Sequence, residues 1–491
     1  MKQKISIEKW PSAVDCRGCA LTFNAHNERP SLMRIRKADL RHRVNAPLVF
    51  RFQSRGLTSF AGLELVRRFF REVGLVRRLR HHLSGTGLDN DFGVARMVLL
   101  LLGLLIAGGR RLRHLLFLQE DPMVLRFCGM KRVPTPRTVS RWLCRFTRHQ
   151  LDRLLQVNDE LVAEAVRRSQ VRRLTIDVDG SVVSTGLQVE WAFRGFNPHH
   201  RKVPSYYPVT AYEAQTGQIF RVKNRPGNIQ DGKASLGFLR DLFAQVRETL
   251  GRRYPLEFRM DGAFFRNDVL DLLETQKATY AIKVPFYTWV GLKTLIQERR
   301  RWRRIDGSIS CFARTLSLAP WEKTLRVVVY RKRVHHWTRK NFQLDLFDPA
   351  DGHYEYSAIV TNTGLNGRNL WFFMCGRGSH EKAYAELKSG FAFDCVPTHN
   401  YGANSAWQIL SVLAFNLMKS FQAATTAQPR ARSRKRRALC LFQSIQSLRY
   451  QWLNRAGRFL CPDGHPTLDL GASPGVKNRF LFMSERLAKA A

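Results

Sequence analysis

Apolar residues follow a helical pattern in the first third of the chain. Between residues 63 and 83 they recur at steps of three and four, with arginines between them, as on one face of an amphipathic helix. The run 97–107 (MVLLLLGLLIA) is apolar on every side and predicts a buried helix, since it is much shorter than the roughly 20 residues that span a bilayer. Residues 56–165 are therefore predicted to be mainly helical.

The segment 134–146 adds a basic stripe to this region. A Thr-Pro start precedes a helical pattern in which Arg137, Arg141 and Arg145 stand four residues apart. Such a stripe is either a solvated helix face or a surface that enters a DNA groove. We expect it to contact DNA.

The pattern changes from period 3.6 to period 2 near residue 174. Residues 174–185 (LTIDVDGSVVST) are β-branched and alternating, and they place Asp177 and Asp179 on one face. Further strands are predicted at 189–193, 205–212, 218–222, 255–265 and 279–284, with helices at 234–250 and 268–276 between them. Asp261 lies near the end of one of these strands. Strands and helices in this order favour a mixed sheet flanked by helices.

Residues 286–370 interrupt the alternation of helices and strands. Short strands are predicted at 302–308, 326–332 and 356–362, separated by polar turns. Trp289 and Trp302 stand here among many cations, and such a mixture is found where aromatic side chains stack on bases. The ordinary alternative is that both tryptophans pack inside the protein.

A second basic and acidic constellation follows at 376–388 (GRGSHEKAYAELK). Glu381 and Lys388 follow Arg377 by four and eleven residues, so a helix would carry all three on one face. Nearby cations keep such a carboxylate ionised, as a metal ligand requires. The ordinary alternative is an exposed face with Arg–Glu pairs. An apolar helix is predicted at 403–421, and a basic run, 430–437 (RARSRKRR), is either a flexible tail or a phosphate-binding arm.

The net charge of the chain favours the functional interpretation of these basic patterns. Lys and Arg number 81 against 39 Asp and Glu, a formal net charge of +42. So large an excess points to a polyanionic partner, and nucleic acid is the usual one. No membrane signal is present in the sequence. Cys16 and Cys19 form a CxxC without a second pair, which is a weak zinc signal. The scattered cysteines are typical of a reducing cytosol.

Three carboxylates from separate elements suit the chemistry of phosphodiester bonds. Two divalent ions about 3.5–4 Å apart stabilise both the entering and the leaving oxygen, and Mg²⁺ prefers oxygen ligands. Asp179, Asp261 and Glu381 supply such ligands from two strands and a helix.

These motifs resemble those of bacterial insertion-sequence transposases of the DDE class. Arg377, Glu381 and Lys388 match the spacing of the signature Tyr-x2-Arg-x3-Glu-x6-Lys, although Met374 stands at the tyrosine position. Asp179-Gly180-Ser181 resembles the first-acid motif, with Asp177 as the alternate ligand, and 259–264 (RMDGAF) resembles the second. Asn404 and 414–417 resemble the helix that closes the core.

The resemblance implies a ribonuclease H-like α/β core with a β-rich insertion and an N-terminal helical DNA-binding region. It implies that Asp179, Asp261 and Glu381 hold two Mg²⁺ ions, with Mn²⁺ as a substitute, and that Arg377 and Lys388 contact DNA phosphates. The expected partners are the terminal inverted repeats, target DNA and a second copy of the chain, in the cytoplasm of a bacterium, at its nucleoid.

The expected organisation is a basic segment, 1–55; a helical DNA-binding region, 56–165; the core, 170–285; the insertion, 286–370; the catalytic and closing helices, 371–425; and a basic tail, 426–491. Two alternatives stay open: a transposase-derived DNA-binding protein without catalysis, and a metal-dependent nuclease that does not join strands.

Overall fold

The structure is a computed structural model that describes residues 56–195, 202–229, 231–334, 354–471 and 473–490. The predicted basic segment 1–55, with Cys16 and Cys19, lies outside the described residues. Arg55–Ala491 form one compact unit.

The predicted helical region begins with α2 (Leu63–Glu72), α3 (Leu75–Leu83) and α4 (Val94–Ala107). The continuous pattern at 63–83 is divided at Gly74, whose φ of +62° is open to glycine at little cost. Nearly every residue of α4 is buried, as the apolar run predicted. No helix among the described residues is both long and apolar enough to cross a membrane. A 3-10 turn (Leu112–Phe117), α5 (Pro122–Cys128), α6 (Pro136–Leu143) and α7 (Arg148–Ser169) complete the region.

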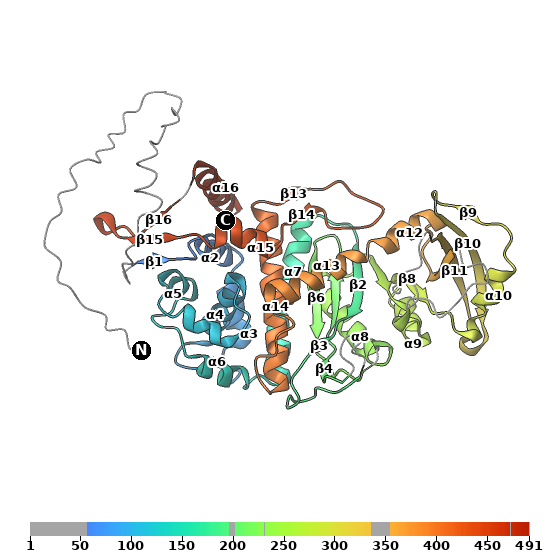
Figure 1. Cartoon of the computed structure of the whole chain (residues 1–491), viewed down its shortest axis with the longest axis horizontal. Helices are drawn as coiled ribbons and strands as arrows, with labels where there is room; N and C mark the ends of the chain where they lie inside the picture. Colours follow the sequence, from blue (N-terminus) through green and yellow to red (C-terminus); the bar gives the residue numbers. More distant parts are fainter. Residues whose placement is uncertain (1–55, 196–201, 230, 335–353, 472, 491) are drawn as a thin grey trace, which may run out of the picture. The chain divides into compact units, whose positions relative to one another are not determined.

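The centre of the fold is a mixed sheet. Its strands are β2 (Leu174–Gly180), β5 (Val209–Glu213), β6 (Gln218–Lys223), β7 (Leu256–Met260) and β8 (Thr279–Val284), in the spatial order β6-β5-β2-β7-β8. β2, β7 and β8 are parallel to one another, while β5 pairs antiparallel with both β2 and β6. The predicted α/β class, a mixed sheet flanked by helices, is confirmed (Figure 1).

Helices cover both faces of this sheet. α8 (Asp231–Leu250) and α9 (Asn267–Thr275) share one apolar cluster with Ile176 and Val178 of β2 and with Phe258 and Met260 of β7. Residues alternate between the faces of a strand, so Asp177 and Asp179 lie on the opposite face. That face meets α13 (Gly378–Phe391) and α14 (Tyr401–Ala424).

The predicted β-rich insertion extends the same sheet. β12 (Tyr354–Thr361) pairs antiparallel with β8, and β11 (Lys323–Arg333), β10 (Ile309–Leu318) and β9 (Arg303–Arg304) follow outward. Among the described residues the result is a sheet of nine strands. α10 (Leu292–Gln297) precedes β9, and α12 (Gly367–Cys375) packs on the inserted strands.

Several predicted elements differ from the structure. The strand predicted at 189–193 was wrong: this segment contains turns, with Trp191 at φ +58° and only an isolated bridge at Phe193. The strand predicted at 205–212 is divided into β4 (Ser205–Tyr206) and β5, because Pro208 lacks the N–H that a ladder needs. β3 (Val183–Ser184) pairs with β4. The strand predicted at 302–308 is reduced to β9, and the long β10 was missed.

The closing helix α14 is tied to the core by a buried amide network. Asn416 Nδ2 donates to Asn158 Oδ1 of α7 at 2.8 Å and to the Ile219 carbonyl at 2.7 Å, while its Oδ1 accepts from Ile219 N. All buried amide groups need such partners. The 414–417 motif therefore fixes α14 against both α7 and β6.

The C-terminal part folds back onto the first helices. β13 (Gln428–Pro429) and β14 (Cys440–Leu441) form a hairpin, followed by α15 (Ile445–Leu448) and a π-helical turn (Arg449–Leu453). β15 (Gly457–Leu460) pairs with β16 (Thr467–Leu470) and with β1 (Leu57–Thr58), and α16 (Pro474–Ala490) ends the chain.

Candidate active site

Asp179 and Asp261 stand side by side at one edge of the sheet. Val178 of β2 and Met260 of β7 are register partners in a parallel pair, so the residues that follow them are neighbours. Asp179 is 19% exposed and Asp261 is 32% exposed. Asp261 Oδ1 accepts from Ala263 N at 3.1 Å and thereby caps a 3-10 turn, Gly262–Phe264. Two carboxylates predicted from separate strands are thus brought together.

The Arg377 guanidinium lies between these two carboxylates. Its Nη2 is 2.8 Å from Asp179 Oδ2 and 3.7 Å from Asp261 Oδ2. Burial lowers the pKa of Arg377, but the charges of Asp179, Asp261, Asp177 and Glu381 outweigh burial and raise it. Arg377 therefore offsets the repulsion between two neighbouring carboxylates.

Glu381 lies one turn further along the chain. It is exposed in the first turn of α13, whose N-terminal cap is Arg377. The helix dipole favours a negative charge at this end. Glu381 is close enough for its charge to act on Arg377, which links it to the pair of aspartates.

Asp177, the alternate first ligand, has a different partner. It and Arg259 form an ion pair in which both side chains are 0% exposed, with contacts of 2.5 Å (Nε–Oδ1) and 2.7 Å (Nη2–Oδ2). Burial raises the pKa of Asp177, and Arg259 opposes this. Arg259 Nη1 also donates to the carbonyls of Phe373 and Lys435, each at 2.8 Å. Asp177 is thus engaged by Arg259, whereas Asp179 contacts Arg377.

A buried histidine joins α13 to the strand beside Asp179. The His380 ring is stacked between Tyr212 and Tyr384, with ring centroids 5.3 and 4.8 Å away. Thr210, the register partner of Asp179, donates to Tyr384 and so accepts from His380 Nε2 at 2.7 Å. Tyr384 donates to the Asp179 carbonyl at 2.9 Å.

This arrangement keeps His380 uncharged. Burial holds the pKa of its imidazole well below the usual range, and the charges of Arg377 and Arg259 lower it further. Its Nδ1 has no hydrogen-bond partner among the described residues, so a proton there would also lack an acceptor. His380 thus positions the turn that carries Glu381.

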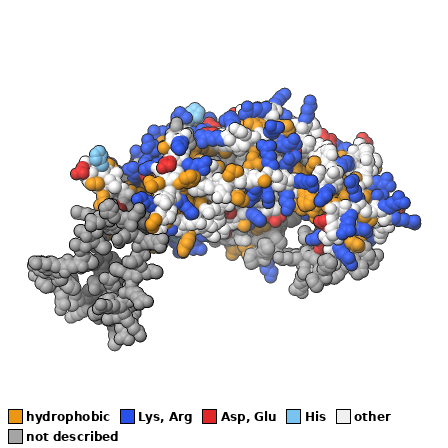
Figure 2. Space-filling model, turned by 90° about the horizontal axis from the view of Figure 1, so that it is seen from above, with side chains coloured by type: hydrophobic (Ala, Val, Ile, Leu, Met, Phe, Trp, Pro, Cys, Tyr) orange, Lys and Arg blue, Asp and Glu red, His pale blue; other side chains and the backbone are white. Residues whose placement is uncertain are grey.

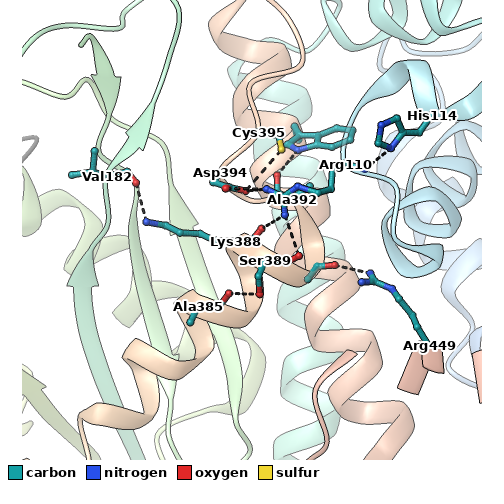
Figure 3. A network of polar contacts seen from close by, with 12 residues as sticks. Arg110, His114, Val182, Ala385, Lys388, Ser389, Ala392, Asp394, Cys395 and Arg449 are labelled. Atoms are coloured by element: carbon teal, nitrogen blue, oxygen red, sulfur yellow. Dashed lines mark hydrogen bonds and ion pairs between the residues drawn. The ribbon is translucent and has the colours of Figure 1, made fainter. Parts of the chain in front are cut away.

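The other end of α13 is held by two arginines from distant parts of the chain (Figure 3). Arg110 donates to the carbonyls of Lys388 and Ser389 and forms a two-pronged contact with Asp394 at 2.8 and 3.0 Å. Arg449 donates to the Gly390 carbonyl. Cations at a helix C-terminus satisfy its free carbonyls and complement its dipole.

Lys388 also has a partner within the protein. Its Nζ donates to the Val182 carbonyl at 2.9 Å, just beyond β2 (Figure 3). Burial lowers its pKa, and Asp394 opposes this. The structure therefore places Lys388 between α13 and the segment that follows Asp179.

The donor chemistry of the site fits a divalent cation. Carboxylate oxygens are the ligands that Mg²⁺ prefers, and Asp179 and Asp261 present them from adjacent strand ends. As the side chains lie, no group of three His, Cys, Asp or Glu among the described residues could hold a metal. Arg377 already contacts Asp179 Oδ2, so a metal ion has to compete with this guanidinium.

The predicted DNA-contacting residues differ in their surroundings. Arg137, Arg141 and Arg145 are exposed, but α6 ends at Leu143, and Arg145 donates to the Asp89 and Gly87 carbonyls. The predicted three-residue helical stripe is therefore two residues long.

The two tryptophans also differ. Trp289 is 42% exposed beside Phe265 and Tyr287. Trp302 is only partly exposed, with Phe312 at 4.7 Å and the Arg331 guanidinium over its ring at 4.6 Å. Trp289 is the better placed of the two to stack on a base.

Sequence reasoning missed the roles of Arg259 and His380. Arg259 is two residues before Asp261 and so shares its face, and it is the register partner of Asp177. The alternation of side chains along the strand therefore indicated which face Arg259 occupies and made the ion pair with Asp177 predictable. His380 gave no such signal, because its stacking partners come from β5 and from the next turn of its own helix.

Comparisons with known proteins identify a family for this chain. A model of the family described as "Transposase DDE domain group 1" matches residues 41–443. None of the curated proteins matches the sequence. Among solved structures, a piggyBac transposase synaptic complex with hairpin DNA is 10% identical, with a TM-score of 0.42, over 89% of this chain and 87% of that one. A Mos1 mariner paired-end complex with Mn is 12% identical, with a TM-score of 0.17, over 34% of this chain and 56% of that one.

Proposed function

The chain belongs to the transposase DDE domain family, group 1, and from this premise we propose that it cuts the ends of its insertion element and joins them to target DNA. The observation that carries the proposal is the meeting of Asp179 and Asp261 at adjacent strand ends around Arg377. Glu381 stands one turn away on the same helix start. These are the three acids of the DDE pattern.

Asp179, Asp261 and Glu381 would hold divalent cations at this edge. When bound, Mg²⁺ or Mn²⁺ activates the attacking oxygen and stabilises the leaving one. Arg377 contacts both aspartates before DNA arrives and offsets the repulsion between their charges. When a metal ion occupies the carboxylates, the Arg377 guanidinium can contact a DNA phosphate instead. This contact would provide the electrostatic stabilisation that phosphoryl chemistry needs.

His380, Tyr384 and Thr210 hold Glu381 in register with Asp179. Because Tyr384 reaches the Asp179 carbonyl and His380 is the neighbour of Glu381, one packed cluster sets both ends of the site. Errors of about 1 Å in such positions cost large factors in rate.

The same proposal extends to the partners. Two element ends have to be held together while they are cut, so we propose that a second copy of the chain joins the complex. The net charge of +42 supports duplex DNA as the common ligand. The site of action would be the bacterial cytoplasm, at the nucleoid.

The test uses a labelled duplex that carries the inverted repeat found next to the gene, with target plasmid and Mg²⁺. We expect cutting at the repeat end and joined products with the unaltered protein, and loss of both, by at least about a hundredfold, with Asp261→Asn. Asp268→Asn is the matched control, since this acid is half-exposed and pairs with Arg266 instead. The control should cut and join normally.

Each alternative gives a different result. Metal-dependent cutting without joined products would identify a nuclease. Specific binding of the repeat without any cutting would identify a DNA-binding protein that has lost catalysis. Equal cutting by the unaltered protein and Asp261→Asn would show that these acids do not form the site.

A further inference from the structure

The basic run Arg430–Arg437, here called the basic arm, is fixed to the edge of the active site. It forms the tip of the hairpin between β13 and β14, and Arg430 N donates to the Leu439 carbonyl across it. A basic run that is only a solvated tail needs no contacts for its backbone. The arm has several.

The first anchor is Arg259. The same guanidinium that pairs with Asp177 donates to the Lys435 carbonyl at 2.8 Å. Gly376 leaves the space for this approach: a Cβ there would lie 2.0 Å from Arg259 Nη1 and 2.0 Å from the Lys435 oxygen. Arg377, whose guanidinium bridges Asp179 and Asp261, is the next residue along the chain, so the contact at Gly376 lies one residue from the site.

Two further contacts hold the returning half of the arm. Arg436 Nε lies 3.5 Å from Glu257 Oε2 on β7, and Leu439 N donates to the Gln215 carbonyl at 2.8 Å. The arm therefore lies over the face of β7 that carries Glu257 and Arg259, the same face as Asp261.

The anchors leave most of the charges pointing outward. Arg432, Arg434, Lys435 and Arg437 are exposed. Figure 2 shows a dense group of Lys and Arg side chains over this part of the surface.

Two further lysines reach the same place from the sheet. Lys283 of β8 and Lys332 of β11 are exposed. Burial raises the pKa of the Cys375 thiol at the end of α12, and the charges of Lys435, Lys332 and Lys283 lower it. The charges of these three lysines therefore all act on one thiol, in the residue before Gly376.

We propose that the basic arm, with Lys283 and Lys332, binds the phosphate backbone of duplex DNA and lays it beside Asp179 and Asp261. This inference deepens the proposed function and rests on it for the identity of the nucleic acid. Contacts to phosphates carry no sequence information, so this placement applies to DNA of any sequence.

The energetic reason for a buried Asp177–Arg259 pair follows from this role. Such a pair contributes little net stability, because desolvation costs about as much as the attraction returns. Here it presents a fixed donor to the Lys435 carbonyl. Arg259 therefore acts as a positioning residue that holds the arm at the catalytic edge.

The test measures DNA affinity against salt concentration in EDTA, where no cutting occurs, with two duplexes of unrelated sequence. The slope of log K against log salt changes by about 0.9 for each phosphate that the protein no longer neutralises. Arg432→Gln, Arg434→Gln and Lys435→Gln together should make it shallower by about 2.7 on both duplexes. The control, Arg247→Gln, Arg252→Gln and Arg253→Gln, removes three exposed charges before β7, at the opposite end of that strand, and should leave it unchanged.

Gly376→Ala tests the anchor without removing a charge. Gly376 has a helical φ of −64°, so alanine fits the backbone, but its methyl group would separate Arg259 from the Lys435 carbonyl. We expect a shallower slope than in the unaltered protein, together with faster tryptic cleavage inside 430–437. An unchanged slope and unchanged cleavage would show that the anchor does not hold the arm.

The outcomes separate the two proposals. An equal decrease of slope in the arm and control variants, or no decrease in either, would refute the proposed role of the basic arm. Tighter binding of single-stranded RNA or anionic vesicles than of duplex DNA would also refute it. A protein that cuts and joins normally with the arm neutralised would refute the arm and leave the proposed function intact. A protein that never cuts but shows the arm-specific slope would do the reverse.

Discussion

Replacing Arg259 by methionine removes the partner with which Asp177 forms a buried ion pair. Both side chains are 0% exposed and share two hydrogen bonds. Removing one member of a buried pair leaves an uncompensated charge and costs about 3–5 kcal/mol. The Phe373 and Lys435 carbonyls also lose their donor, which adds about 1 kcal/mol. We therefore expect the free energy of unfolding to fall by about 4–6 kcal/mol.

The assay is reversible urea denaturation, followed by fluorescence and circular dichroism. The double variant Asp177→Leu/Arg259→Met should recover most of the stability, because a buried pair can be exchanged for apolar residues of similar volume at little cost. A deficit of about 1 kcal/mol should remain, since the two carbonyls still lack their donor.

Arg173→Met is the matched control, because Arg173 lies one residue before β2 and pairs with the neighbouring strand β7. Arg173 also pairs with an acid of β7, Glu257, at 2.8 Å, but it is 46% exposed. A partly solvated pair contributes about 0–1 kcal/mol. The reasoning is refuted if Arg259→Met costs no more than Arg173→Met, or if the double variant is as unstable as the single one.

Three other variants test the positions of the site residues. His380→Asn should remove a pH dependence of stability, because the folded protein keeps this histidine neutral while the unfolded chain gains a proton below pH ~6.5. The free energy of unfolding should therefore fall by about 1.4 kcal/mol per pH unit below that value in the unaltered protein only. Equal slopes for protein and variant in pH-dependent denaturation would contradict this. Arg110→Met should slow cutting without changing DNA affinity, because it loosens the end of α13, whereas Arg111→Met, an exposed neighbour, should change neither. Trp289→Ala should reduce cutting of element ends if the ring stacks on a displaced base; normal cutting in the same gel assay would count against stacking.

The sequence predicted those parts of the fold that depend on local pattern. β6 and β8 were found within a residue of their observed ends, because their alternating apolar residues agree with their positions in the sheet. β10 was missed, since its second half is largely exposed and polar and is held as a strand by pairing with β11. The predicted strand at 189–193 was wrong because strand-forming residues there have no ladder to join.

The candidate site divides in the same way. Spacing alone could bring Arg377 and Glu381 to one helix start, and strand ends could bring Asp179 and Asp261 together. The choice between Asp177 and Asp179 could not be made from local pattern, because both lie on one face. Arg259, 82 residues away along the chain, pairs with Asp177, and this contact is why we propose Asp179 as the first ligand.

Met374 illustrates a departure whose setting only the structure gives. It stands where the resembled signature has tyrosine, and it is 9% exposed in an apolar cluster with Leu370 and Phe373. A phenol there would have to find a hydrogen-bond partner in apolar surroundings. Methionine suits this position, and the proposed site does not depend on a tyrosine.

The most direct test of the central claim is the binding of Mn²⁺, counted by electron paramagnetic resonance, in the presence of repeat-end DNA that has already been cleaved at the end. We predict that the unaltered protein binds Mn²⁺ and that Asp179→Asn, Asp261→Asn and Glu381→Gln each lose most of it, while Asp268→Asn binds normally. Undiminished Mn²⁺ binding by all three variants would contradict a metal site built from these acids.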